Sequence, residues 1–279
     1  ALVMELARVM SHFSFDRTIV FMLTTGEEQG LHGARAMSDY IKDQDIPLRA
    51  VLNNDVIGGI ICGETASPPG CPGLNHIDSI NVRIYSYGSF NSRSKQLARF
   101  VKLQYQEQIF PLIPVKTVIN IMTPEDRSGR GGDHIPFRIA GYGAVRFTSA
   151  NEHGNGNPAT PDYHDRQHTI TDELGVDTDN DGILDSFFVD FNYLSRNAII
   201  NGNALAAAAL GPATPQELEV DNLPGGFTVS FEDPENYGTY RVAVRENTMN
   251  EWDTLIYTNQ TTDTIFGLKD STLYSISVT

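Results

Sequence analysis

Thr18–Gly30 reads TIVFMLTTGEEQG, and the fold can be worked out from this stretch. Its first half, TIVFML, is continuously apolar, which is typical of a strand buried on both faces of a sheet. The second half places Glu27 and Glu28 side by side. In open α/β sheets, binding sites form beyond the carboxyl ends of the strands. The stretch therefore predicts a buried strand that carries two acids to a site.

The pattern around this stretch alternates between strands and helices. Further strands are predicted at Leu48–Leu52, Ile80–Tyr85, Lys116–Met122 and Ala144–Phe147, and helices at Leu31–Lys42, Ser92–Gln108 and Phe187–Leu210. Such alternation indicates an α/β domain with a mostly parallel sheet and helices on both faces. We assign residues 1–210 to this domain.

A different pattern follows the linker at residues 211–214. Residues 215–279 show no helical periodicity. Short alternating strands are predicted at Phe227–Phe231, Tyr240–Arg245, Thr254–Tyr257, Thr264–Leu268 and Tyr274–Val278. Turn signals separate them, so this part is predicted to be a small all-β sandwich.

Charge excludes several classes of partner. The 279 residues include 20 Lys and Arg against 35 Asp and Glu, a net charge of −15. Nucleic acids and anionic lipids are bound through basic surfaces, so neither is expected here. No apolar run approaches the ~20 residues of a transmembrane helix. Cys62 and Cys71 flank a Pro- and Gly-rich loop; whether they form a disulfide is left open by the sequence.

A third acid is expected beside Glu27 and Glu28. Asp55 follows the strand Leu48–Leu52, so parallel strands would bring it to the same sheet edge. Three crowded carboxylates repel one another unless a cation neutralises them or one takes up a proton. The alternative is that the acid pair opens a helix, where the macrodipole favours negative charge.

Histidines supply candidate metal ligands after the last strand of this domain. His153, His164 and His168 are all close enough in sequence, and neutral histidine is a common zinc ligand. Their chemistry alone does not choose among them.

Four segments together resemble a known family. They are TTGEEQGLHGARAM (24–37), LNNDVIG (52–58), GRGGDHIPFRIAGYGAVRF (129–147) and QHTITD (167–172). In this order they resemble the two-zinc exopeptidases, which include secreted leucyl-type aminopeptidases, glutamate carboxypeptidases and glutaminyl cyclases. The resemblance implies a secreted zinc exopeptidase that acts on peptides or proteins.

The resemblance also implies roles for individual residues. Glu27 matches the general base that takes a proton from the metal-activated water, and Glu28 and His168 match the ligands of one zinc. Asp55 matches a ligand of the other zinc. Residues that support the ligands are implied at Asp133, His134 and Asp172.

Two departures from the family pattern affect the expected activity. The family's His-x-Asp pair and bridging Asp precede the helix with which this chain opens, and His76–Asp78 is rejected because it follows the acid pair. We therefore expect the isolated chain to bind zinc poorly and an extended form to be active. Gln167 stands where some members have Tyr; Tyr163 or His164 could substitute.

A calcium-binding loop is predicted at Asp177–Asp185 (DTDNDGILD). Asp177, Asp179, Asp181 and Asp185 occupy alternate ligand positions, and Gly182 permits the sharp turn. The twelfth position is Phe188 rather than Glu, so Asp190 is considered as a substitute. The alternative is a solvated acidic loop before the helix.

The C-terminal segment resembles a partial fibronectin type III domain, in which Leu268 and Tyr274 match the tyrosine corner. This resemblance implies attachment to a surface or polymer, or spacing. For the whole chain, aminopeptidase activity is the leading interpretation. The alternatives are a glutaminyl-cyclase-like acyl transferase and a calcium-stabilised binding protein with an inactive peptidase domain. The preferred side chain and the oligomeric state are left open.

Overall fold

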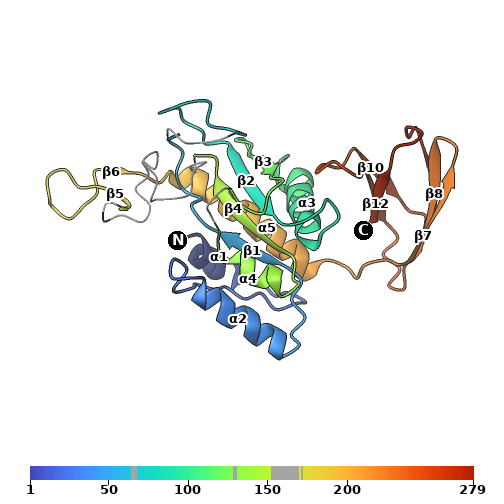
Figure 1. Cartoon of the computed structure of the whole chain (residues 1–279), viewed down its shortest axis with the longest axis horizontal. Helices are drawn as coiled ribbons and strands as arrows, with labels where there is room; N and C mark the ends of the chain where they lie inside the picture. The colour runs from blue at the N-terminus through green and yellow to red at the C-terminus, as the bar shows by residue number, and fades with distance from the viewer. Residues whose placement is uncertain (64–67, 128–130, 152–169, 171) are drawn as a thin grey trace. The chain divides into compact units, whose positions relative to one another are not determined.

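The computed structural model describes residues 1–63, 68–127, 131–151, 170 and 172–279 (Figure 1). The chain forms two compact units, Ala1–Ala209 and Leu210–Thr279. Among the described helices, none is both long enough and apolar enough to span a membrane.

A four-stranded mixed sheet organises the first unit. Its strands are β1 (Val51–Asn54), β2 (Asn81–Ser86), β3 (Val118–Ile121) and β4 (Ala144–Ser149), in the order β1-β4-β2-β3. The pairs β1–β4 and β2–β3 are parallel, and β2–β4 is antiparallel. The carboxyl ends of β1 and β4 therefore lie at the same edge of the sheet as the amino ends of β2 and β3.

In the described part of this unit, five α-helices and one π-helical turn accompany the sheet. They are α1 (Leu2–Met10), α2 (His32–Asp43), α3 (Arg93–Gln104), its continuation η1 (Tyr105–Ile109), α4 (His134–Ile139) and α5 (Phe191–Leu210). Most lie within a few residues of the helices that the sequence predicts. The last one begins later than predicted, because residues 186–187 pair with 175–176 as a short hairpin, β5 and β6. Asp190 then accepts a hydrogen bond from the Tyr193 N–H at 2.6 Å and caps α5.

Both faces of the sheet bury apolar side chains. On β4, Val145 and Phe147 belong to the large core that includes Leu6 of α1 and Ile200 of α5. Ala144 belongs instead to a core shared by α2 and α4. Successive side chains of a strand point to opposite faces, so β4 is enclosed on both sides.

The predicted strand at Thr18–Leu23 is wrong. No strand is assigned to these residues, although Ile19 and Phe21 pack against the large core. Val20 and Leu23 are 64% and 69% exposed, so the run is half-buried rather than buried on both faces. A continuously apolar run predicts a strand buried on both faces, but a strand forms only where the backbone also pairs with a neighbouring strand through hydrogen bonds.

The second unit consists of two three-stranded antiparallel sheets, ordered β11-β8-β7 and β10-β9-β12. Their bounds are β7 (Gln216–Leu223), β8 (Gly226–Glu232), β9 (Tyr240–Glu246), β10 (Thr254–Thr258), β11 (Thr262–Phe266) and β12 (Tyr274–Val278). Apolar residues of β8, β9, β11 and β12 form one core. The sequence analysis missed β7 because its acidic residues are all exposed.

The Tyr274 hydroxyl contacts the backbone a few residues upstream. The Lys269 N–H donates a hydrogen bond to the Tyr274 hydroxyl at 3.1 Å. Tyr274 and Leu268 both pack against the shared core. The side chain therefore fixes the start of β12 to the turn that precedes it.

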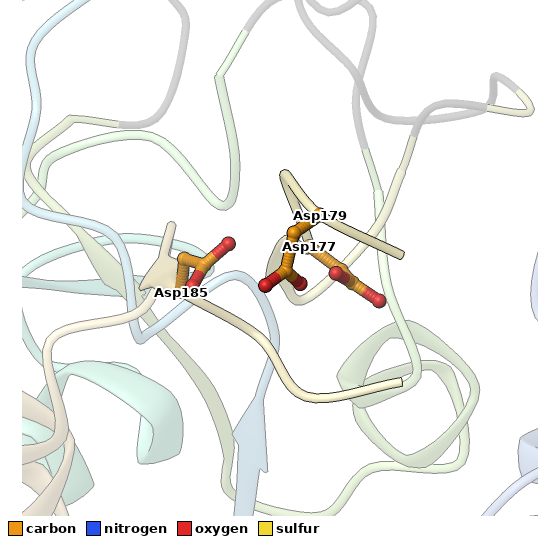
Figure 2. Close-up of side chains that lie close together, drawn as sticks. All are labelled: Asp177, Asp179 and Asp185. Carbon is orange, nitrogen blue, oxygen red and sulfur yellow. The ribbon is translucent and has the colours of Figure 1, made fainter. Parts of the chain in front are cut away.

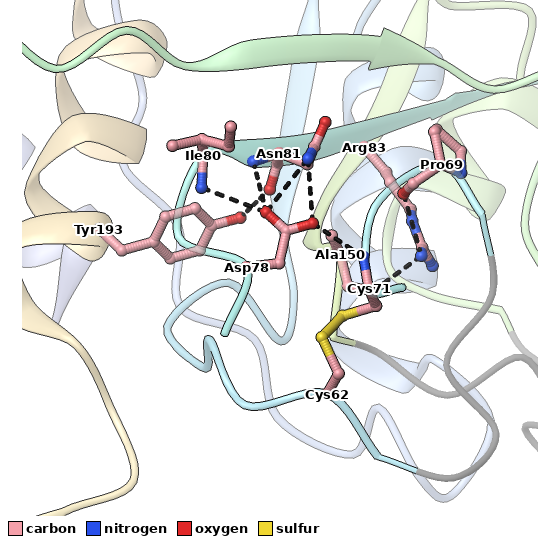
Figure 3. The surroundings of a disulfide bond; sticks show 9 residues. All are labelled: Cys62, Pro69, Cys71, Asp78, Ile80, Asn81, Arg83, Ala150 and Tyr193. Carbon is pink, nitrogen blue, oxygen red and sulfur yellow. Dashed lines mark hydrogen bonds between the residues drawn. A yellow bond between two sulfur atoms is a disulfide. The ribbon is translucent and has the colours of Figure 1, made fainter. Parts of the chain in front are cut away.

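Cys62 and Cys71 form a disulfide, which decides the question that the sequence left open. Figure 3 shows Asp78 beside it, with Asn81 and the Cys71 backbone around its carboxylate. Asp78 is buried and accepts hydrogen bonds from the backbone N–H groups of Cys71, Ile80 and Asn81. The disulfide and Asp78 thus close the loop that follows β1.

Candidate active site

A tight turn presents the acid pair. The N–H of Leu31 donates to the Glu27 carbonyl at 2.8 Å, and the N–H of Gly33 donates to the Thr25 carbonyl at 3.0 Å. A Cβ atom at Gly33 would lie 2.9 Å from the Thr25 backbone, so only glycine permits this approach. Helix α2 begins at His32 and has no acid in its first turn. The interpretation of Glu27 and Glu28 as helix-opening acids is therefore wrong.

Asp55 directly follows β1 and is held through its backbone. Its N–H donates to the Phe147 carbonyl of β4 at 3.1 Å. The next residue, Val56, has a φ of 53°, which is strained for a β-branched side chain. Its carbonyl accepts three hydrogen bonds, from the Ser149 N–H, the Ser149 hydroxyl and the Thr148 hydroxyl. The end of β4 therefore fixes the backbone on both sides of the Asp55 side chain.

Glu27 lies among other acids. Burial, followed by the negative charges of Asp55, Glu28 and Asp133, raises the pKa of Glu27 to about 7, while Arg146 opposes the rise. A carboxylate with a pKa near neutrality can both accept and release a proton at physiological pH. The structure thus brings Glu27 into the electrostatic range of Glu28 and Asp55.

Arg146 was not recognised in the sequence analysis. It is buried in β4, where its Nη2 atom lies 3.0 Å from Asp55 Oδ2 and its Nη1 atom lies 2.5 Å from Asp126 Oδ1. A lone arginine within the apolar strand GAVRF was the available signal, since arginine is almost never fully buried without a partner.

Asp133 and His134 lie where α4 begins. The Thr24 hydroxyl donates a hydrogen bond to Asp133 Oδ2, which joins α4 to the segment that carries the acid pair. Asp133 Oδ1 is buried and has no hydrogen-bond partner among the described residues. His134 is fully buried, and its Nε2 atom lies 3.3 Å from the Glu125 carbonyl.

Several predicted residues cannot be placed. His153, Tyr163, His164, Gln167 and His168 lie outside the described residues. Asp172 is among the described residues and is exposed. Its position relative to His168 is not described. The rejection of His76–Asp78 is consistent with the structure, because the Asp78 carboxylate is already occupied by hydrogen bonds from Cys71, Ile80 and Asn81.

The donors around Glu27 fit a divalent metal. Glu28 and Asp55 offer carboxylate oxygens, which zinc accepts as ligands together with histidine nitrogen. The buried Asp133 Oδ1 atom has no described hydrogen-bond partner, as expected of a carboxylate beside a cation that offsets the mutual repulsion of the acids.

The acidic loop forms a second group of carboxylates. Ligand oxygens of Asp177, Asp179 and Asp185 all lie within 4.8 Å of one another, the only such trio found in the described part of the chain. Figure 2 shows their side chains close together. Asp181 is not in the trio, and its carboxylate accepts a hydrogen bond from the Ile183 N–H at 2.8 Å. Asp190, the suggested substitute ligand, is used instead to cap α5.

One family profile and several curated proteins match the chain. The profile described as Peptidase family M28 matches residues 1–64, which contain Glu27, Glu28 and Asp55. A probable zinc metalloprotease of Pyrenophora tritici-repentis is 27% identical over 290 residues, covering 100% of this chain and 62% of the relative. Another, of Pyricularia oryzae, is 31% identical over 274 residues, covering 92% of this chain and 51% of the relative. The chain thus spans between half and two thirds of the length of these relatives.

Two solved structures are also similar. An aminopeptidase from an Aneurinibacillus species has a TM-score of 0.45 and 19% identity, covering 75% of this chain and 38% of the other. A zinc aminopeptidase from Bacillus subtilis has a TM-score of 0.48 and 18% identity, covering 76% of this chain and 40% of the other.

His134 makes acid stability testable. Burial and then the charge of Arg146 lower the pKa of His134 from 6.5 to about 4. Between these values the unfolded chain binds a proton that the folded chain excludes, so stability rises with pH and is lost as the pH falls from 6.5 to 4. We expect His134→Gln to remove up to about 3 kcal/mol of this pH-dependent change, measured by urea unfolding across that range.

His12, which is exposed after α1, provides the control. His12→Gln should keep the pH dependence of the wild type. If His134→Gln folds and keeps the same pH dependence as well, the assigned pKa of His134 is incorrect. His134→Asn serves as a second variant if glutamine does not fit.

Proposed function

We propose that this chain carries the catalytic residues of a zinc-dependent exopeptidase that releases N-terminal residues from peptides. The observation that carries the proposal is the position of Glu27, which is half-buried and lies within electrostatic range of Glu28, Asp55 and Asp133. The match of residues 1–64 to Peptidase family M28 and the similarity to probable zinc metalloproteases support it.

The proposed roles are those that the resemblance to the two-zinc exopeptidases implies. Glu28 and His168 would hold one zinc and Asp55 would help to hold a second. Zinc, when bound, lowers the pKa of a coordinated water to about 7 and polarises the scissile carbonyl. Glu27 accepts the proton of the attacking water and returns it to the departing amine, which its pKa of about 7 allows at neutral pH.

The surrounding residues hold Glu27 and Asp55 in position. The turn closed at Gly33 fixes the backbone of Glu27. The bond from Thr24 to Asp133 joins this turn to α4. Because the acids come from separate segments, these contacts must be in place before the site can act.

The central test is the substitution Glu27→Gln, which removes the proton acceptor and keeps the size of the side chain. With the chain extended upstream, the form expected to be active, we expect hydrolysis of an aminoacyl anilide to fall by about 10²–10⁴-fold, with zinc affinity within a few-fold of the unsubstituted extended form. Activity assays and calorimetric zinc titration measure the two quantities on the same preparation.

Glu28→Gln is the matched control at the neighbouring position. It should lose zinc affinity as well as activity, which separates a ligand from a base. Full activity of Glu27→Gln would contradict the assignment. Release of cyclised N-terminal glutamine instead of free amino acids would favour the acyl transferase, and zinc uptake without any turnover would favour a binding protein.

We also propose that the acidic loop binds calcium through Asp177, Asp179, Asp181 and Asp185. The clustering of three of these carboxylates supports this assignment, as does the left-handed turn at Gly182 (φ 87°). Bound calcium would stabilise the β5–β6 hairpin that precedes α5.

Calorimetry with the whole chain tests this site. Extracellular calcium modules bind at about 10⁻⁴–10⁻³ M, and we expect an affinity in this range. Asp177→Asn should abolish uptake, whereas Asp172→Asn, an exposed acid outside the loop, should not change it. Absence of calcium uptake at millimolar concentration would exclude the site.

We further infer that the protein is secreted and that the second unit is a fibronectin type III-like sandwich used for attachment. The disulfide supports secretion, since disulfides persist in oxidising compartments. The shared core of two antiparallel sheets and the Tyr274 contact support the sandwich.

Insoluble cell-wall polymers are the test ligand for attachment. Residues 1–279 should sediment with them and residues 1–210 should not.

A further inference from the structure

The charge of Arg146 opposes that of the acids around Glu27, and its side chain bridges two carboxylates inside the protein. Its guanidinium contacts Asp55 Oδ2 at 3.0 Å and Asp126 Oδ1 at 2.5 Å. Only 2% of the Arg146 side chain is exposed, against 36% for Asp55 and 5% for Asp126. Asp126 is thus the buried partner of Arg146, and Asp55 is the partner that lies at the candidate site.

The geometry suits arginine better than lysine. A guanidinium is planar and presents five donors in a fixed fork, so separate nitrogens can bind separate carboxylates. Lysine would offer a single ammonium group. The two ion pairs here use two different nitrogen atoms, Nη1 for Asp126 and Nη2 for Asp55.

The backbone of the same strand holds Asp55 from the other side. Phe147 accepts the Asp55 N–H, and Thr148 and Ser149 bind the Val56 carbonyl. Four consecutive residues of β4 therefore hold Asp55 and the residue after it. Arg146 is the one of the four that contacts the Asp55 carboxylate.

We propose that Arg146 is a positioning residue, which orients the Asp55 carboxylate for metal binding and is itself held by Asp126. The inference rests on the proposed metal-dependent function. Arg146 does not touch substrate; it acts by fixing the direction of one Asp55 oxygen and by supplying positive charge to an edge crowded with acids. Residues that orient metal ligands typically contribute 10- to 100-fold to metal affinity.

Cobalt binding provides the test, because the visible absorption of Co²⁺ reports the ligand geometry. The 279-residue chain is titrated with Co²⁺ up to millimolar concentration. We expect Arg146→Lys to weaken Co²⁺ binding by about 10- to 100-fold and to change the spectrum at saturation. Urea unfolding of each metal-free variant shows whether it is folded.

Arg138→Lys is the matched control. Arg138 makes a two-pronged ion pair with Glu125 at 2.5 and 2.6 Å, next to Asp126 in sequence, but it has no recorded contact with Asp55. This variant should keep the wild-type affinity for Co²⁺ and the wild-type spectrum, although it disturbs the segment that contains Glu125 and Asp126.

Asp126→Asn separates positioning from a general loss of stability. If Asp126 acts through Arg146, Asp126→Asn weakens binding in the wild type and adds no further loss in the Arg146→Lys background. A folded Arg146→Lys variant with wild-type affinity and spectrum would overturn the inference while leaving the proposed function intact. Failure of the wild-type chain to bind Co²⁺ would overturn both.

Discussion

Mutual repulsion among carboxylates is the constraint on which the candidate site depends. Like charges separate in water, yet the fold holds Glu28, Asp55 and Asp133 close enough to Glu27 for their charges to act on it. Covalent connectivity, hydrogen bonds and the buried charge of Arg146 oppose this separation. Burial, and after it the negative charges of Asp55, Glu28 and Asp133, raise the pKa of Glu27, and a proton or a divalent cation relieves the repulsion. The same electrostatic cost that disfavours this arrangement in the metal-free chain therefore favours a metal in the proposed enzyme.

Periodicity located α2, α3 and most strands, because burial on one face leaves a repeating pattern. It failed at Thr18–Leu23. These residues do contact the apolar core, but they do not pair with a neighbouring strand, and no local signal in a sequence specifies which strand will be a neighbour. Asp55 does lie within electrostatic range of Glu27, but the parallel strand from which this was expected, Thr18–Leu23, is absent. Arg146 and Asp126 were missed because their partnership joins residues 20 apart in sequence that belong to no recognised motif.

Parallel direction between β1 and β4, rather than across the whole sheet, is what the site requires. Strand β2 runs antiparallel to β4, so the sheet is mixed, and the disulfide-closed loop lies between β1 and β2 in sequence. The expected meeting of the acids relied on a different pair, the predicted strands Thr18–Leu23 and Leu48–Leu52, and no strand is assigned to the first of these. Function thus depends on one strand pair more than on the fold class.

That strand pair also determines when the site can form. Val56 and Thr148, which bind each other at the end of the pair, are 92 residues apart in sequence. Closing a loop of this length costs about 4 kcal/mol in chain entropy on a simple polymer estimate. During synthesis the acid pair and Asp55 emerge from the ribosome long before β4, so these carboxylates must exist without Arg146 for much of translation. Assembly of the candidate site is consequently coupled to completion of the sheet, because the contacts that fix Asp55 come from its last strand.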